Sequence, residues 1–231
     1  MNHALALLSL AGCGRIGFDE LPGADAPASG PAIVQLTQAT FTGSSSALTL
    51  MPTRAHDLLV VITDNVLTGT PLDTISDDAN DAYVSSGMVA QRMPPPSVLE
   101  LWYVPDSQAG AQTLTITDQG SVNREIWFLE LEGMDHVAPL ELVQTLSHAT
   151  ETGMPAAPPI TPSALPALIV AGIAVPGTVM TVAAPFEELP IIRGDDAAYA
   201  ITEAAGTFTA AWRIGATGEY SALAAAFRAT P

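Results

Sequence analysis

The chain from Ile33 onward consists of short apolar or alternating segments, separated by turns rich in proline and glycine. Leu58–Thr63 is an apolar, β-branched run, which is typical of a strand buried on both faces. Gln112–Thr117 alternates strictly between polar and apolar residues, as a half-buried strand does. Helical periodicity is weak throughout. We predict further strands at Ala32–Gln38, Ala47–Met51, Val98–Val104, Arg124–Glu132, Ala167–Val175, Ala198–Thr202, Gly206–Ile214 and Tyr220–Arg228.

Two parts of the chain share one order of segments: a buried strand, a variable insert, an Ala-Gly turn into an alternating strand, and an apolar strand. The members are Asp57–Ile62, Gln108–Thr117 and Ile126–Leu131 in the first part, and Ala167–Gly172, Ala204–Trp212 and Ala222–Phe227 in the second. This repeat favours a strand over a helix for the alanine-rich last segment. We predict an all-β fold, a β-sandwich or jelly roll built from two related halves of four or five strands, about 33–134 and 160–231.

Composition narrows the choice of partners and of chemistry. Apolar residues make up 48% of the 231 residues, which predicts a folded chain, and the net charge of −17 disfavours nucleic acid and anionic lipid headgroups as partners. Cys13 is the only cysteine, so an intramolecular disulfide and a zinc site with several thiolates are excluded.

The first residues have the features of a secretory signal. The apolar run Ala4–Leu10 is followed by small residues and by Cys13. Leu10-Ala11-Gly12-Cys13 resembles the lipobox of bacterial lipoproteins, whose cysteine thiol receives a diacylglyceryl group before the chain is cut in front of it. The resemblance implies lipidation of Cys13 and a lipid bilayer as a partner. The segment departs from the family in being short and in having no Lys or Arg before the apolar run.

Pro, Gly, Ala and Asp dominate the residues after the cysteine and predict a flexible tether. Cys13–Asp19 resembles the start of lipoproteins from myxobacteria-like organisms. Gly14, not Asp, follows the cysteine, so no inner-membrane retention signal is implied, and we expect a lipid-anchored protein at the outer membrane or cell surface. The predicted organisation is a signal peptide over 1–12, a disordered, lipidated tether over 13–32 and a β-sandwich over 33–231.

Five motifs in the body form a further pattern: Asp57–Val60, Ile75–Tyr83, Leu101–Tyr103, Ala109–Thr115 and Glu130–Gly133. Together they resemble secreted bacterial β-sandwich modules of the extracellular, adhesion-like type, over roughly residues 33–229. Ala79 stands where those modules have a glycine. The resemblance implies an extracellular β-sandwich and assigns no ligand.

An acidic stretch is the best candidate for a metal site: Asp73, Asp77, Asp78, Asn80 and Asp81. Hard cations such as Ca²⁺ take several oxygen ligands, which this stretch can supply, so calcium is the one cofactor that we consider. The spacing does not fit an EF-hand loop. The alternative is a solvated turn in which Asp and Asn cap their own backbone.

Glu130 and Glu132 fall on one face of a strand, and paired carboxylates are what a glycosidase uses, although exposed glutamates at a strand end are more often solvated surface. Trp102 and Tyr103 point to opposite faces, so we expect one in the core and one nearer the surface. Trp102, Tyr103 and Glu130 form our candidate ligand-binding set, as aromatic faces stack on sugar rings. For Trp127 and Trp212 we predict core packing.

The chain contains no Gly-x-Ser-x-Gly, no His-Glu-x-x-His and no phosphate-binding glycine loop. We therefore expect a non-enzymatic cell-envelope lipoprotein that displays a recognition or structural module, with a glycan or another surface protein as its partner. The alternative is a polysaccharide-active enzyme or a carbohydrate-binding accessory module, which would need convergent polar groups in a concave pocket.

Overall fold

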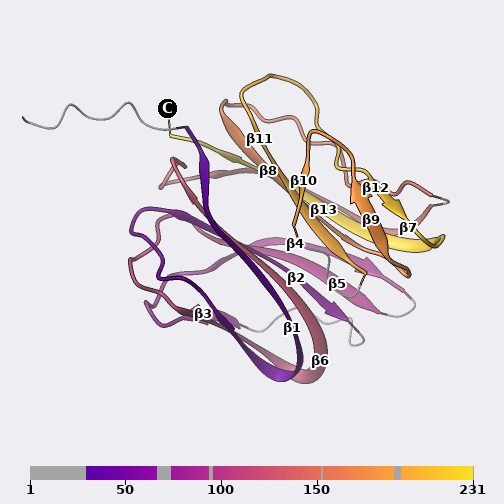
Figure 1. Ribbon diagram of the computed structural model, residues 1–231, viewed down its shortest axis with the longest axis horizontal. Helices are drawn as coiled ribbons and strands as arrows, with labels where there is room; N and C mark the ends of the chain where they lie inside the picture. The colour runs from indigo at the N-terminus through magenta and orange to yellow at the C-terminus, as the bar shows by residue number, and fades with distance from the viewer. Residues whose placement is uncertain (1–29, 67–73, 94–95, 152, 190–193, 231) are drawn as a thin grey trace, which may run out of the picture.

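The structure, a computed structural model, describes residues 30–66, 74–93, 96–151, 153–189 and 194–230, and it confirms an all-β sandwich (Figure 1). Cys13, the predicted signal and the predicted tether up to residue 29 lie outside these residues, and Ala32, the last residue of the predicted tether, begins β1. The first sheet contains β1 (Ala32–Thr49), β2 (Leu58–Val66), β3 (Thr74–Asp77), β4 (Val84–Arg92), β5 (Ser97–Val104) and β6 (Thr113–Glu132). The second contains β7 (Leu140–Glu151), β8 (Ala167–Ala174), β10 (Glu187–Glu188), β11 (Asp196–Thr202) and β13 (Gly218–Arg228), while β9 (Val179–Val182) pairs with β12 (Trp212–Ile214).

The two halves have the same topology. The first sheet has the order β1-β6-β2-β5-β4, and the second, read from its other edge, has the order β7-β13-β8-β11-β10. The pairing of β3 with the first part of β6 corresponds to the pairing of β9 with β12, so β12 and β13 together take the place of β6. All these ladders are antiparallel. Each half is therefore one copy of a duplicated unit.

Strand register matches the repeat that the sequence predicts. In the first half, Leu58 of β2 pairs with Leu131 of β6. In the second half, the corresponding Leu168 of β8 pairs with Phe227 of β13. The predicted equivalence of Asp57–Ile62 with Ala167–Gly172 therefore agrees with the pairing of both segments with their neighbours.

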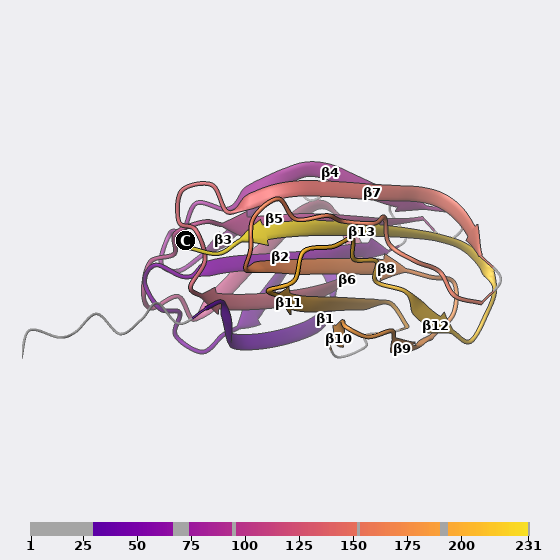
Figure 2. The same cartoon turned by 90° about the horizontal axis from the view of Figure 1, so that it is seen from above.

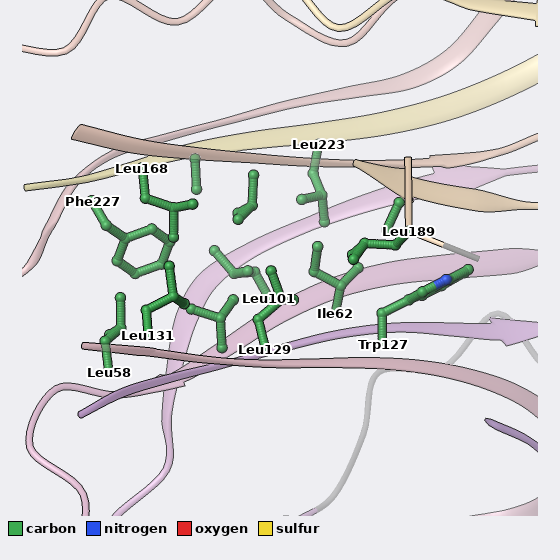
Figure 3. Packing of buried hydrophobic residues seen from close by; sticks show 14 of the residues in the cluster. Leu58, Ile62, Leu101, Trp127, Leu129, Leu131, Leu168, Leu189, Leu223 and Phe227 are labelled. Carbon is green, nitrogen blue, oxygen red and sulfur yellow. The ribbon is translucent and has the colours of Figure 1, made fainter. Parts of the chain in front are cut away.

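A central core lies between the two sheets (Figure 3). Alternate residues of β2 and β8 face it, and β6 and β13 supply larger side chains to the same layer, including Trp127 and Phe227. The ring of Tyr103 meets the ring of Phe227 edge-on, with centroids 5.7 Å apart. Because both halves contribute, neither sheet buries its inner face without the other.

Each half also has an outer core on the opposite face of its sheet. The long strands β1 and β6 curl, with a register irregularity between Gly43 and Ser45, so that their far ends and β3 cover this face. In the second half, β9 and β12, the strand that contains Trp212, cover the outward residues of β8 and β13. The curl explains why β2 is buried on both faces, as its apolar run predicts. Core packing of Trp127 and Trp212 is also confirmed.

Some boundaries differ from the prediction. Ala32–Gln38 and Ala47–Met51 belong to one bent strand, β1, and Gln112–Thr117 continues into Arg124–Glu132 as β6. Of Gly206–Ile214, only the last residues form a strand. The strands β4 and β7 were not predicted because both lie at sheet edges, where one side is polar. They run along the same edge of the sandwich (Figure 2), and the Gln91 backbone N–H donates to Ser147 Oγ at 3.0 Å.

The sandwich has two distinct ends. At the entry end, Ala32 pairs with Glu132, and the Thr230 backbone N–H donates to the Gly133 carbonyl. At the distal end, Val66 closes β2 and pairs with Asn123 of β6. Nine residues along β6 separate Glu132 from Asn123, which corresponds to roughly 30 Å. The chain therefore enters the fold at the end remote from the site described next.

Candidate functional site

A cavity of about 250 Å³ opens at the distal end, between the two halves. The first half contributes the ends of β2 and β4 and the middle of β6, and the second contributes the turn after β8 and the residue before β11. Half of the lining residues are apolar or glycine, and half are polar or charged. The lining residues are Val66, Arg92, Asn123, Glu125, Val175, Pro176, Gly177 and Asp195. We call this space the distal cavity.

Carboxyl groups from both halves meet beside the distal cavity. Asp64 of β2 accepts a hydrogen bond from Ser97 Oγ, and Asp195 Oδ1 accepts one from the Val175 backbone N–H at 2.6 Å. Burial raises the pKa of Asp64, and the nearby Arg92 guanidinium acts in the opposite direction. Burial, and then the negative charges of Asp64 and Glu125, raise the pKa of Asp195 well above its ordinary value. The Asp195 carboxyl therefore holds its proton more tightly than an exposed aspartate does.

Two arginines are buried in the same region, with different surroundings. Arg124 Nε donates to Asn65 Oδ1 at 3.0 Å, and its Nη1 donates to Ser46 Oγ at 2.9 Å. Arg92 is only 3% exposed, and its Nε and Nη1 are buried without a hydrogen-bond acceptor among the described residues. Arg92 also lines the distal cavity, but these two nitrogen atoms have almost no accessible surface there.

The second-half wall of the distal cavity is tightly packed. Gly194 has φ of 107°, and a Cβ there would lie 2.4 Å from the Gly177 carbonyl oxygen. A Cβ on Gly177 would in turn lie 2.7 Å from the Ala216 Cβ. Glycine is required at both positions, which holds the turn after β8 against the neighbouring loops.

The carboxylates of the predicted calcium residues accept hydrogen bonds from their own loop and from the segment that leads into β6. Asp77 Oδ1 accepts from the backbone N–H groups of Ala79 and Asp81, each at 3.0 Å, and its Oδ2 accepts from Tyr83 Oη at 3.0 Å. Asp78 Oδ1 accepts from the N–H groups of Gln112 and Thr113, and these bonds lower its pKa.

The rest of the acidic stretch follows the same pattern. Asn80 takes a left-handed conformation with φ of 64°, and Asp81 Oδ1 accepts from the Gln108 N–H at 2.7 Å. Burial raises the pKa of Asp81 to about 6. Asp73 lies outside the described residues. Across the described part of the chain, no group of three or more His, Cys, Asp or Glu side chains is arranged to hold a metal ion.

Calcium binding stays a prediction, with a direct measurement. If the stretch from Asp73 to Asp81 binds Ca²⁺, addition of a chelator to protein purified with calcium will lower its melting temperature, because a ligand of the native state stabilises it. An unchanged melting temperature contradicts calcium as a cofactor.

The predicted ligand-binding set does not form one surface. Trp102 packs against the outer core of the first half, and Tyr103 packs against the central core, so the expected opposite orientations hold but both rings are half-buried. Glu130 is 0% exposed, which corrects the expectation of a solvated glutamate. Its Oε1 accepts from the Arg54 backbone N–H at 2.6 Å, and its Oε2 from Gln35 Nε2.

Glu130 faces a second carboxyl group, Asp57. Burial and then the proximity of Glu130 raise the pKa of Asp57 to about 6. Glu132, on the same strand, pairs with the Arg54 guanidinium at 2.8 Å. Asp57 and Glu130 are both buried at the entry end and do not line the distal cavity. The two carboxyl groups of a glycosidase lie on either side of the substrate. Asp57 and Glu130 are instead both buried, with no space between them for a substrate.

Sequence reasoning missed Asp64, Arg92 and Asp195, which the fold brings together from separate strands. The sequence contained one signal for this cluster. Asp64 comes near the end of a buried, mainly apolar strand, where a polar side chain needs a buried hydrogen-bonding partner.

Comparisons of the chain with protein-family models, with curated proteins and with solved structures give no match. Within the described ranges, no helix is long and apolar enough to cross a membrane.

Proposed function

We propose that the protein is a cell-envelope lipoprotein, anchored through acylated Cys13, that displays a non-enzymatic β-sandwich recognition module. Its lipid partner is the bilayer, and its recognition partner is presented from outside, as a glycan or a component of another surface protein. The lipobox-like Leu10-Ala11-Gly12-Cys13 supports the anchor. The net charge of −17 gives no attraction to an anionic membrane, so acyl chains would supply the anchoring, at about 0.8 kcal/mol per buried methylene.

The position of the distal cavity is the observation that carries the recognition role. The chain enters the sandwich at Ala32, beside Glu132, and the cavity lies next to Asn123 and Val66 at the other end. A module held at its entry end presents its distal end outward. Polar or charged residues make up half of the cavity lining, and convergent polar groups of this kind fix the orientation of a ligand in a binding site.

The alternative, a polysaccharide-active enzyme or carbohydrate-binding accessory, receives less support. No aromatic side chain is among the residues that line the distal cavity, so it offers no ring for a sugar to stack on. The carboxyl pair of Asp57 and Glu130 is enclosed by the sheet and has no access to a polymer. We therefore favour binding over catalysis.

A Cys13→Ser variant will move from the membrane fraction to the soluble fraction, because removal of the thiol removes the site of acylation. Fractionation of cells that express the full chain, followed by immunoblotting, measures this shift. Metabolic labelling with a fatty-acid analogue should mark the native chain and leave the variant unlabelled.

Ser9→Ala is the matched control, since it alters the apolar run and keeps the cysteine. It should fractionate with the native protein. Recovery of Cys13→Ser in the membrane fraction at the native level would refute the lipid anchor.

A further inference from the structure

Methionine lies mainly on the surface of this protein, whereas leucine lies mainly in its cores. Six of the seven methionines belong to the described part of the chain, and five of those six are exposed. In contrast, only three of the seventeen described leucines are exposed. Methionine and leucine are similar in size and apolar character, so packing alone does not account for this division. The five side chains, which are between 42% and 60% exposed, are those of Met51, Met88, Met93, Met154 and Met180.

The thioether of methionine has one chemical property that a leucine side chain lacks: two-electron oxidants convert it into a sulfoxide. Few other groups of this chain compete for such an oxidant. The chain has no lysine, whose amine also reacts with hypochlorous acid, and Cys13 is its only cysteine. The indole rings of Trp127 and Trp212 are buried. The exposed thioethers are therefore the main targets of an oxidant that reaches the folded protein.

The main chain beside exposed methionines is held by hydrogen bonds that do not involve sulfur. The Met51 backbone N–H donates to Gln35 Oε1 at 3.1 Å, and the Met51 carbonyl accepts from Gln35 Nε2 at 3.0 Å. The Met93 backbone N–H donates to Glu219 Oε1 at 2.6 Å. An oxygen added to an exposed sulfur would face water, so these contacts can persist after oxidation.

Met134 is the exception among the described methionines, and its position shows what oxidation would do inside the fold. Its side chain is 0% exposed and belongs to the central core. Its backbone forms a bridge with Ala229, and its carbonyl accepts from Thr230 Oγ1 at 2.8 Å. A sulfoxide here would bury a polar oxygen in an apolar layer. An oxidant reaches this sulfur only when the fold opens locally.

We propose that the five exposed methionines form an oxidant-consuming surface, on which each thioether takes one oxygen atom at the expense of one hypochlorous acid while the sandwich stays folded. The sulfur lone pair attacks chlorine, the O–Cl bond breaks, and water then displaces chloride from sulfur. The products are a sulfoxide, chloride and a proton, and sulfur loses the two electrons that chlorine gains. Methionine sulfoxide reductases, with a dithiol as reductant, restore the thioether. This role goes beyond the recognition function and does not rest on it.

Treatment of the full chain in detergent micelles with hypochlorous acid, followed by peptide mass spectrometry, tests this proposal. We expect each of the five exposed methionines to gain one oxygen, and Met134 to be oxidised at least about tenfold more slowly, because its reaction requires local opening. The melting temperature should fall by less than about 4 °C, since surface changes perturb stability little. Methionine sulfoxide reductases of both epimer specificities, with dithiothreitol, should return the five peptides to their native masses.

Replacement of all five exposed methionines by leucine provides the matched control, because leucine keeps the apolar volume and lacks the sulfur. This variant should fold as the native protein does and consume at least about threefold less hypochlorous acid. Met134→Leu is a second test. At an excess of oxidant that unfolds the native protein, this variant should stay folded, because its central core no longer contains an oxidisable sulfur.

Equal oxidation rates at Met134 and at the exposed methionines, unfolding of the chain by the five sulfoxides, or native oxidant consumption by the five-leucine variant would overturn the proposal. These results leave the Cys13 anchor and the distal cavity untouched, because neither takes part in the measurements.

Discussion

Replacement of Trp127 by alanine will lower the free energy of unfolding by about 3–5 kcal/mol. Trp127 is 1% exposed and lies in the central core, on β6, close to residues that both halves contribute (Figure 3). Its removal leaves a void in the layer that joins the sheets, and the surrounding strands cannot collapse to fill it. Urea denaturation followed by circular dichroism measures the loss.

Two controls define this prediction. Trp127→Phe should lower the free energy of unfolding by less, because a ring remains in the layer. Met51→Ala, at a side chain that is 59% exposed, should stay within about 0.5 kcal/mol of the native value.

We also expect a single unfolding transition for the native protein, since the central core is shared. Two separate transitions would show that the halves unfold independently and would contradict the shared core.

Raising the pH from about 4 to about 9 will destabilise the protein, by on the order of 2–5 kcal/mol for Asp196 alone. Burial raises the pKa of Asp196 from an ordinary value of 3.8 to about 8. The folded state therefore holds a proton that the unfolded state has already lost in this range. The stabilisation is complete below about pH 4 and is lost as the pH rises through about 8. Asp57, Asp81 and Asp195, whose pKa values are also raised, act in the same direction.

Asp196→Asn isolates this effect. Asp196 Oδ2 accepts from Trp212 Nε1 at 2.7 Å, and an asparagine oxygen can accept the same bond without titrating. We expect the variant to be more stable than the native protein at pH 9 and to lose less stability between pH 7 and 9. Urea midpoints at each pH provide the measurement. Asp78→Asn is the control, because that exposed carboxyl has a lowered pKa and should not flatten the curve. A native pH slope in Asp196→Asn would contradict the assignment.

Much of the fold follows from local pattern. The apolar run at Leu58–Thr63 and the order of segments in the two halves predicted the central strands and their equivalence. The edge strands β4 and β7 were not predicted, because a strand with one polar face has a weak hydrophobic pattern. In β4, Gly87 weakens this pattern further. The sequence also did not predict that β1 and β6 are each one continuous strand, because a bend in a strand has the same sequence pattern as a turn.

The site was less accessible to sequence reasoning. Asp64 and Arg92 lie on β2 and β4 of the first sheet, on either side of β5, and the stacking of the second half brings Asp195 to them. The acidic stretch around Asp77 attracted attention because its residues are adjacent in sequence. Four of its five residues are described, and the three aspartates among them accept backbone N–H groups of the fold. A cluster of acidic residues in the sequence therefore indicated a structured turn. The distal cavity, in contrast, is formed by residues that are far apart in the sequence.

The equivalence of β2 and β8 has a consequence for the history of the fold. Ile62 and Gly172 occupy corresponding positions, and they also touch: a Cβ on Gly172 would lie 3.2 Å from Ile62 Cγ2. In a symmetric dimer of identical chains, residues on the two-fold axis meet their own copies. Isoleucine would then crowd isoleucine, and glycine would leave a hole beside glycine. A single chain whose two halves have diverged in sequence can instead pack a bulky residue against a position that has no side chain.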